Sequence, residues 1–262
     1  MNEPKIYFIG AGKMATALAC GMVKVTGADS LAAFDKSAEA SEAFARKTGA
    51  SGTFLLEEAD IVFLAVKPQH LATATAGREN ILKDKLIVSI LAGTRLEQLR
   101  AKTGSERIVR VMPNISATIG AGVSGVIKTD AVSGAEFAVI EKLLAATGIY
   151  ECFSEEYLFD VVTALSGSGP AFVFEFIKAL ADGAVTAGMP QAQALRLAAA
   201  TVVGAGRMVQ MGEDPSLLRN QVMSPGGTTA EGIRELEKHG FRSAVIEAVI
   251  ATARKSQELG KK

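Results

Sequence analysis

Over the first 150 residues, short apolar runs alternate with segments that carry an apolar residue every three or four positions. The short runs are rich in β-branched and aromatic residues and predict buried strands, whereas the periodic segments predict amphipathic helices. Strands that alternate with helices in this way form a parallel sheet covered on both faces. The predicted strands are residues 5–9, 31–34, 61–66, 86–90, 107–112 and 123–128, and the predicted helices are 13–25, 38–47, 70–76, 96–103 and 133–146.

After Phe153 the pattern changes, because helix signals continue and no further strand is predicted. Thr228 and Glu231 have the spacing of a capping box, in which Thr228 caps a helix and Glu231 reaches back to its backbone. We therefore expect an α/β domain at residues 1–153 and an all-helical domain at residues 154–262.

Two helical segments of the second domain, residues 172–177 and 194–203, are apolar on nearly every face. A domain of roughly 100 residues has too little interior to bury both segments. We expect the second subunit of a homodimer to cover them, and a larger assembly stays open. The alternative is that they form the hydrophobic centre of a monomer.

Composition narrows the class of protein. Lys and Arg total 28 and Asp and Glu total 28, so the net charge is zero and a nucleic-acid partner is not expected. No apolar run has the length of a membrane span and no signal peptide is recognised, so a cytoplasmic protein is expected. Cys20 and Cys152 are expected to be buried free thiols, and His70 and His239 surface residues, so a metal site is not expected.

The run Gly10-Ala11-Gly12-Lys13-Met14-Ala15 follows a predicted strand and opens a predicted helix. In that context it is the dinucleotide fingerprint: the first glycine permits a tight turn, the second admits the pyrophosphate, and Ala15 lets the helix lie close to the strand. The phosphates then lie on the helix N-terminus. Residues 1–153 are therefore expected to be a Rossmann-type doubly wound parallel sheet, with cofactor bound by Gly10, Ala11, Gly12, Lys13 and Met14.

The end of the second strand, at Asp35, Lys36 and Ser37, is where the adenosine ribose is expected. Asp35 lies 25 residues after Gly10 and favours NAD, because an acid near this position binds the ribose 2′-hydroxyl. Lys36 and Ser37 favour NADP, because they are able to bind a 2′-phosphate. The choice between NAD and NADP stays open.

Two further segments, residues 65–69 and 111–114, follow predicted strands and contain Pro68 and Pro113, which end the strands. Ligands of open α/β sheets bind at these strand ends. Lys67 and Asn114 are therefore expected to point toward the ribose and the nicotinamide.

The helical domain contributes two loops with small residues. Residues 166–170 are expected to join two helices, and residues 224–229 lead into the capping box. Consecutive free N–H groups at the second loop suit a carboxylate. With Thr228 as the cap, the Thr229 hydroxyl stays available to a substrate.

These motifs together resemble pyrroline-5-carboxylate reductase along essentially the whole chain. The resemblance is carried by the glycine run at 10–15, Val66-Lys67-Pro68-Gln69, Arg110-Val111-Met112-Pro113-Asn114, the run at 165–174, and Met223-Ser224-Pro225-Gly226-Gly227-Thr228-Thr229 with the residues after it. It implies reduction of 1-pyrroline-5-carboxylate to proline with NADPH or NADH, the last step of proline biosynthesis. It also implies an all-α dimerisation domain, with dimers that assemble further into a decamer.

The resemblance also implies roles for individual residues. The backbone of Gly226, Gly227, Thr228 and Thr229 is expected to hold the substrate carboxylate, the Thr229 side chain to orient the imine nitrogen, and Ser224 to bind the substrate as well. Because a threonine hydroxyl is a poor general acid, we expect water to be the proton source. The nicotinamide half of the cofactor is expected to contact Ala65, Lys67, Pro68, Met112 and Asn114, and Val66 and Pro113 are expected to bind the cofactor as well. Many members have Asn-Arg-Ser where this chain has Asp35-Lys36-Ser37, which leaves the cofactor preference open.

Two other function classes fit the sequence less well. A β-hydroxyacid dehydrogenase has a lysine and an asparagine where this chain has Val173 and Phe176, so alcohol oxidation lacks its proton acceptor. A non-catalytic redox sensor needs no carboxylate-binding loop such as residues 224–229.

Overall fold

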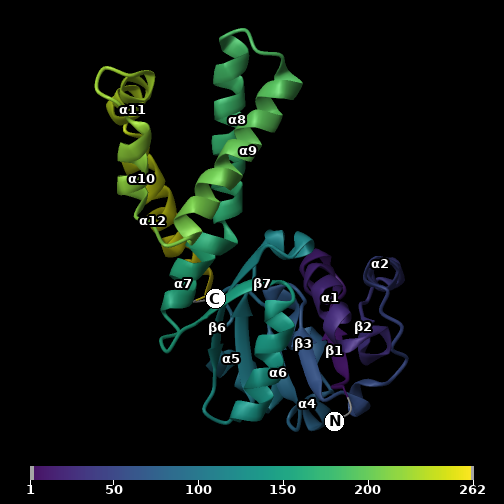
Figure 1. Ribbon diagram of the computed structural model, residues 1–262. Helices are drawn as coiled ribbons and strands as arrows, with labels where there is room; N and C mark the ends of the chain where they lie inside the picture. The colour runs from purple at the N-terminus through teal and green to yellow at the C-terminus, as the bar shows by residue number, and fades with distance from the viewer. Residues whose placement is uncertain (1–2, 261–262) are drawn as a thin grey trace. The chain divides into compact units, whose positions relative to one another are not determined.

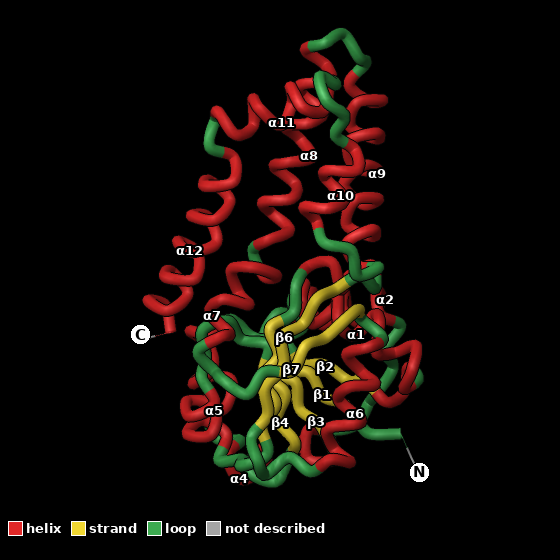
Figure 2. Tube along the Cα trace, turned by 60° about the vertical axis from the view of Figure 1, so that its left-hand side comes forward, coloured by secondary structure: helices red, strands yellow, loops and turns green. Residues whose placement is uncertain are grey.

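The computed structural model describes residues 3–260, and in it seven strands form one sheet in the order β2-β1-β3-β4-β5-β6-β7 (Figures 1 and 2). The first five strands are parallel, β6 runs antiparallel to β5, and β7 is parallel to β6. The strands are β1 (Ile6–Ile9), β2 (Leu31–Phe34), β3 (Ile61–Leu64), β4 (Leu86–Ser89), β5 (Ile108–Met112), β6 (Gly122–Lys128) and β7 (Gly148–Cys152).

The sheet confirms the six predicted strands and adds two features that the pattern did not reveal. The β5–β6 pair is antiparallel because the short connection from Met112 to Gly122 holds only the 3₁₀ turn Ile115–Ile119, and a parallel return needs a longer crossover. Strand β7 was missed because it lies at the sheet edge and is mostly exposed, which removes the apolar signal of a buried strand.

Helices cover both faces of the sheet. On one face α1 (Lys13–Thr26), α2 (Ala38–Thr48) and α6 (Gly134–Ala145) pack into one apolar core, in which the Phe8 and Phe63 rings stack with centroids 4.7 Å apart. On the other face α3 (Leu71–Thr75), α4 (Glu79–Leu82) and α5 (Leu96–Thr103) enclose a second core. This is the doubly wound arrangement expected from the sequence.

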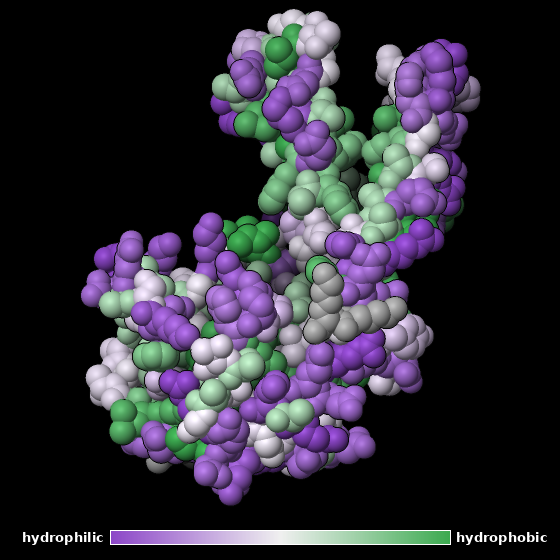
Figure 3. Space-filling model, turned by 180° about the vertical axis from the view of Figure 1, so that it is seen from behind, coloured by the Kyte–Doolittle hydropathy of each residue, from purple (hydrophilic) through white to green (hydrophobic). Residues whose placement is uncertain are grey.

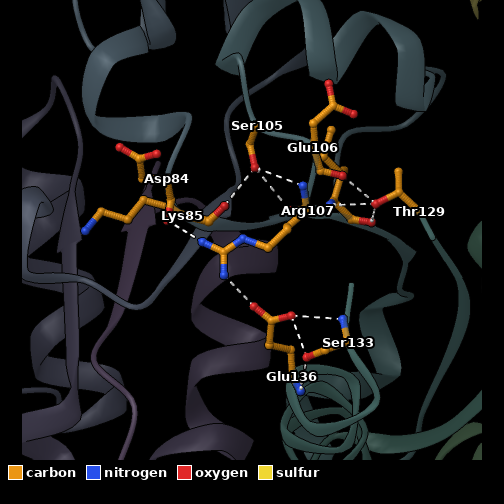
Figure 4. Close-up of polar contacts among 9 residues, drawn as sticks. Asp84, Lys85, Ser105, Glu106, Arg107, Thr129, Ser133 and Glu136 are labelled. Carbon is orange, nitrogen blue, oxygen red and sulfur yellow. Dashed lines mark hydrogen bonds and ion pairs between the residues drawn. The ribbon is translucent and has the colours of Figure 1, made fainter. Parts of the chain in front are cut away.

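Polar contacts tie together the loops at the edge where the parallel strands begin (Figure 4). The Arg107 guanidinium, just before β5, forms an ion pair of 2.6 Å with Glu136 and donates to the Asp84 carbonyl. Glu136 in turn caps α6 through the Ser133 backbone N–H at 2.9 Å. These contacts serve the fold, since ligands of such sheets bind at the opposite, carboxyl edge.

Contacts divide the chain into two units: the first holds the residues up to Ser168 together with those from Ala251 onward, and the second runs from Gly169 to Ile250. The division therefore falls later than the predicted boundary after Phe153. The reason is that Phe159, 1% exposed, is buried in the first unit, and Asp160 accepts a hydrogen bond of 2.6 Å from Ser256.

The second unit consists of helices alone. Its buried apolar cluster contains only Ala181, Ala194 and Ala198 among the described residues, while large apolar side chains such as Phe174 (61% exposed) and Leu197 (57% exposed) face outward. Figure 3 shows this hydrophobic surface along the helices. The helices are α8 (Gly169–Thr186), α9 (Gln191–Gln210), α10 (Pro215–Val222), α11 (Thr228–Lys238) and α12 (Phe241–Gly260), the last of which continues into the first unit.

The structure also shows how exposed the histidines and cysteines are. His70 and His239 are exposed, as predicted. Both cysteines are free, but Cys152 is exposed and Cys20 is half-buried, so the expectation of two buried thiols was wrong. Cys152 lies on the exposed edge strand β7, where a neighbouring apolar residue does not imply burial. Within residues 3–260, no helix is both long and apolar enough to cross a membrane.

Candidate functional site

The turn between β1 and α1 approaches the end of β3 so closely that only glycine fits at its first position. Gly10 has φ +104°, and a Cβ there would lie 2.7 Å from the backbone carbonyl carbon and oxygen of Ala65. Its N–H donates to the Phe34 carbonyl at 2.8 Å, which joins the turn to the end of β2. The turn is therefore fixed between the carboxyl ends of β2 and β3, the two strands that flank β1.

The start of α1 is open and fits a pyrophosphate. Gly12 is the N-cap, no side chain caps the helix, and a Cβ at Gly12 would meet nothing within 4 Å. In the described part of the chain, the N–H groups of Gly12, Lys13 and Met14 have no acceptor. Free N–H groups and the positive end of the helix dipole favour a phosphate at this position.

A cleft of about 470 Å³ extends from this turn along the ends of β2 and β3. Many of the predicted cofactor residues line this cleft. It is also lined by residues that no sequence motif assigned to the cofactor, above all His70 and Arg78. Its lining residues are Ile9, Gly10, Gly12, Phe34, Asp35, Lys36, Ser37, Ala65, Val66, Lys67, His70, Thr73, Ala74 and Arg78. Arg78 was missed because it lies after α3, away from any strand end.

Other predicted cofactor residues lie outside this cleft. Pro68 lines a second cavity, of about 800 Å³, together with Thr94, Ser256 and neighbouring residues of the first unit. Ala11 is buried under the glycine turn, and the side chain of Met14 packs partly against the core. For Met14 the backbone is therefore the part available to a cofactor, whereas the Lys13 side chain is exposed.

The Asp35 carboxylate holds the glycine turn in place. One oxygen accepts a hydrogen bond from the Ala11 N–H at 2.9 Å, and the other accepts from the Ser37 N–H at 3.0 Å. Asp35 was predicted from its distance to Gly10 as a partner of the ribose. The structure gives its side chain a structural task as well, since two backbone donors depend on it.

At the end of β5, Asn114 is 5% exposed, and both the nitrogen and the oxygen of its side-chain amide form hydrogen bonds. Its amide nitrogen donates to the Ser166 carbonyl at 3.0 Å, and its oxygen accepts from the Val123 N–H at 3.1 Å. Met112 packs against Gly167 so closely that a Cβ on the glycine would lie 2.8 Å from the methionine methyl. Asn114 therefore positions this region, and its contact with the nicotinamide stays a prediction.

Residues 166–170 join two helices, as expected, but the connection is shorter than a loop over all five residues, because only Ser168 lies outside a helix. The helix α7 (Leu158–Val162) continues as a π-helical turn, Thr163–Gly167, closed by a hydrogen bond of 2.8 Å from the Ser168 N–H to the Thr163 carbonyl. Such a turn leaves a carbonyl for an outside donor, and Asn114 supplies that donor to Ser166. π turns of this kind are frequent at functional sites.

A buried ion pair anchors the same region to the sheet. Arg110 of β5 donates to Glu156 at 2.9 Å, and Glu156 also accepts from the Leu96 N–H at 2.7 Å. The guanidinium lies 4.5 Å from the centre of the Phe159 ring. Burial lowers the pKa of Arg110, while the carboxylate of Glu156 opposes that shift. The ion pair holds the segment that leads into α7 against the sheet, so the Arg110 charge is already paired and is not free to bind a ligand.

In the helical unit, residues 224–229 form a turn that opens α11. Gly226 has φ +67°, and the Gly227 N–H donates to the Ser224 carbonyl at 3.0 Å. The N-cap of α11 is Gly227 and not Thr228, so the predicted capping box is absent. Glu231 instead pairs with Arg234, at 2.6 Å.

This geometry leaves several donors free at the start of α11. In the described residues, the N–H groups of Gly226, Thr228 and Thr229 and both threonine hydroxyls have no hydrogen-bond partner. The Thr228 side chain is exposed and that of Thr229 is half-buried. The turn therefore suits a small carboxylate with a hydroxyl beside it.

Comparison with known proteins agrees with this arrangement. Residues 156–259 match the family model for pyrroline-5-carboxylate reductase dimerisation, and residues 5–93 match the model described as NADP oxidoreductase, coenzyme F420-dependent. Pyrroline-5-carboxylate reductase of Arabidopsis thaliana is 40% identical over 97% of this chain and 95% of its own length. That of Methanosarcina acetivorans is 41% identical over 100% of both chains. This chain belongs to the pyrroline-5-carboxylate reductase family.

A solved structure of the family extends the comparison to the cofactor. Plasmodium falciparum pyrroline carboxylate reductase, with NADP bound, has a TM-score of 0.88 and 30% identity, and the match covers 99% of each chain. The family resemblance drawn from the motifs is therefore confirmed, as are the Rossmann-type domain and the dimerisation domain that follows it. The oxidoreductase match includes the glycine turn, which agrees with the use of NADP or NAD.

Proposed function

We propose that this protein reduces 1-pyrroline-5-carboxylate to L-proline with hydride from NADPH or NADH, the last step of proline biosynthesis. The observation that carries the proposal is the full-length relationship to pyrroline-5-carboxylate reductases. The open start of α1 and the cleft beside it support the cofactor half of the site. The turn at residues 224–229 supports the substrate half.

The first unit binds and orients the cofactor in this proposal. Backbone N–H groups of Gly12, Lys13 and Met14 hold the pyrophosphate, and residues 35–37 face the adenosine ribose. Ala65, Val66 and Lys67 line the cleft beyond the glycine turn, toward the nicotinamide half. When bound, the dihydronicotinamide supplies the hydride that the imine carbon accepts.

The second unit binds the substrate in this proposal. The free N–H groups of Gly226, Thr228 and Thr229 donate hydrogen bonds to the substrate carboxylate, with Ser224 and Gly227 shaping the turn. The Thr229 hydroxyl orients the imine nitrogen. A protonated imine is already electrophilic, so the protein has to position it rather than activate it strongly. A threonine hydroxyl is a poor acid, so water delivers the proton.

The direct test is turnover by the purified protein. With pyrroline-5-carboxylate and either reduced cofactor, we expect cofactor oxidation matched by an equal amount of proline. With 3-hydroxy acids and oxidised cofactor, we expect no reaction, because the dehydrogenase lysine is replaced by Val173. Cofactor binding without proline formation would instead support the sensor class and overturn the proposal.

We also propose that the protein is a homodimer formed through the helical unit, and that a decamer built from dimers is its larger assembly. The small buried cluster of that unit and its exposed apolar side chains support a partner chain. Zero net charge supports small-molecule rather than nucleic-acid partners. Two unpaired cysteines support a reducing compartment, and we propose the cytoplasm.

A further inference from the structure

Arg78 lies in the cofactor cleft although it belongs to a part of the chain that no motif marks. It is the N-cap of α4, and its guanidinium carbon lies 5.7 Å from the centre of the Phe34 ring. Phe34 is the last residue of β2 and directly precedes residues 35–37. Arg78 is thus held beside the strand end where the adenosine ribose lies in Rossmann domains.

Two contacts orient the Arg78 side chain and leave most of its donors free. One terminal nitrogen donates to the Ala74 carbonyl at 2.9 Å, and the Phe34 ring lies against the cation. A guanidinium has five N–H donors in a planar fork that matches phosphate oxygens. Within residues 3–260, no carboxylate forms an ion pair with Arg78.

The charges that line the cleft favour an anion at this end. Lys36 and Arg78 are the cations at this end, Lys67 adds a third cation further along the cleft, and Asp35 supplies the one carboxylate of the lining. That carboxylate accepts two backbone hydrogen bonds, so its charge is already directed toward donors of the fold. A 2′-phosphate carries a charge of about −1.5 to −2 at neutral pH. It therefore gains more binding free energy from these cations than a neutral ribose hydroxyl does.

We propose that Arg78, together with Lys36 and the Ser37 hydroxyl, binds the 2′-phosphate of NADPH and makes this chain prefer NADPH to NADH. Ser37 caps α2 by accepting from the Ala40 N–H at 3.2 Å, and its own O–H stays free to donate to a phosphate oxygen. The positive charge of Arg78 thereby offsets the negative charge of Asp35, which would otherwise repel the phosphate. The inference rests on the proposed function for the reaction, and on the cleft alone for the binding step.

The test compares two ligands that differ only in the 2′-phosphate, adenosine 2′,5′-bisphosphate and adenosine 5′-monophosphate. Isothermal titration calorimetry of the full chain should show the bisphosphate binding at least about tenfold more tightly. Arg78→Gln should raise the Kd of the bisphosphate about tenfold to thirtyfold and change the Kd of the monophosphate less than about twofold. Arg78→Lys should give an intermediate value, because it keeps the charge and loses the fork.

Arg46→Gln is the matched control, since Arg46 is an exposed arginine of α2 that does not line the cleft. It removes the same charge and should leave both dissociation constants unchanged. Equal weakening of both ligands by Arg78→Gln, or no weakening of either, would overturn the inference, as would a wild-type chain that binds both ligands equally. If the bisphosphate binds as expected but pyrroline-5-carboxylate is not reduced, the proposed function fails and the inference stands.

Discussion

The Asp35 carboxylate accepts a hydrogen bond of 2.9 Å from the backbone N–H of Ala11, and so joins the end of β2 to the glycine turn that begins the cofactor site. Its other oxygen accepts from the Ser37 N–H. The residue that sequence spacing assigns to the ribose is therefore also part of the structure that shapes the phosphate site. Substitutions at Asp35 should act on both.

Asp35→Asn should raise KM for both cofactors, because the amide nitrogen cannot accept a hydrogen bond from one of the two backbone donors. The loss of a charge-assisted hydrogen bond should cost about 1.5–3 kcal/mol of stability. The ratio of KM for NADPH to KM for NADH should nevertheless fall, since a negative charge near the 2′-phosphate is removed. Steady-state kinetics with both cofactors measure this ratio.

Asp130→Asn serves as the control for Asp35→Asn, because Asp130 is exposed and forms no ion pair within the described residues. It should change neither KM nor stability. An unchanged KM ratio in Asp35→Asn would show that the charge of Asp35 does not act on the ribose end.

Asn114→Ala should destabilise the first unit. The substitution leaves the partly buried Ser166 carbonyl and Val123 N–H without this partner, at a cost of about 2–4 kcal/mol in unfolding free energy. Chemical denaturation followed by circular dichroism measures the change, with Asn80→Ala on the exposed face of α4 as the control. A loss of cofactor affinity with unchanged stability would mean that Asn114 acts on the ligand directly.

Thr229→Val should lower kcat/KM about tenfold to a hundredfold, equivalent to roughly 1.4–3 kcal/mol of transition-state stabilisation, because it removes only the hydroxyl that we propose orients the imine. Thermal stability should stay unchanged, since that hydroxyl makes no hydrogen bond in the described structure. Binding of NADPH, followed by its fluorescence, should also be unchanged.

Thr228→Val is the matched comparison for Thr229→Val. Because Gly227 is the N-cap of α11, the substitution should not incur the loss of about 1 kcal/mol that removal of a capping threonine produces. We expect kcat/KM to fall less than about threefold. A larger loss from Thr228→Val than from Thr229→Val would mean that the two threonines have exchanged roles.

Phe174→Asp should convert the oligomer to monomer or aggregate, because Phe174 is 61% exposed in the single chain and a buried charge in an apolar interface is costly. Phe176 is a poorer probe, since its ring packs against Phe241 within the same unit, with centroids 5.7 Å apart. Sedimentation velocity measures the change, and Gln193→Asp, an exposed polar position of α9, is the control. A native monomer in the unmodified protein would refute the dimer.

The sequence by itself determined the order of the first six strands of the first unit, the glycine turn and the family. The signals that determined them are local. They are the spacing of apolar residues, the spacing of glycines after a strand, and short motifs whose function depends on the backbone of a single turn. The same locality explains the errors. The edge strand β7 lacks a buried face, and the capping box at Thr228 had the right spacing, but the backbone turned at Gly226 and made Gly227 the cap.

Only the tertiary structure decided which distant residues act together. It brought Arg78 onto Phe34 and into the cofactor cleft, bound Asn114 to the π turn at Ser166, and returned Ser256 to Asp160. Each contact joins parts of the chain separated by dozens of residues, and its energy depends on how the sheet, its loops and its helices pack. Local patterns carry no signal for such contacts, because a residue's neighbours along the chain do not specify the side chain that will face it after folding.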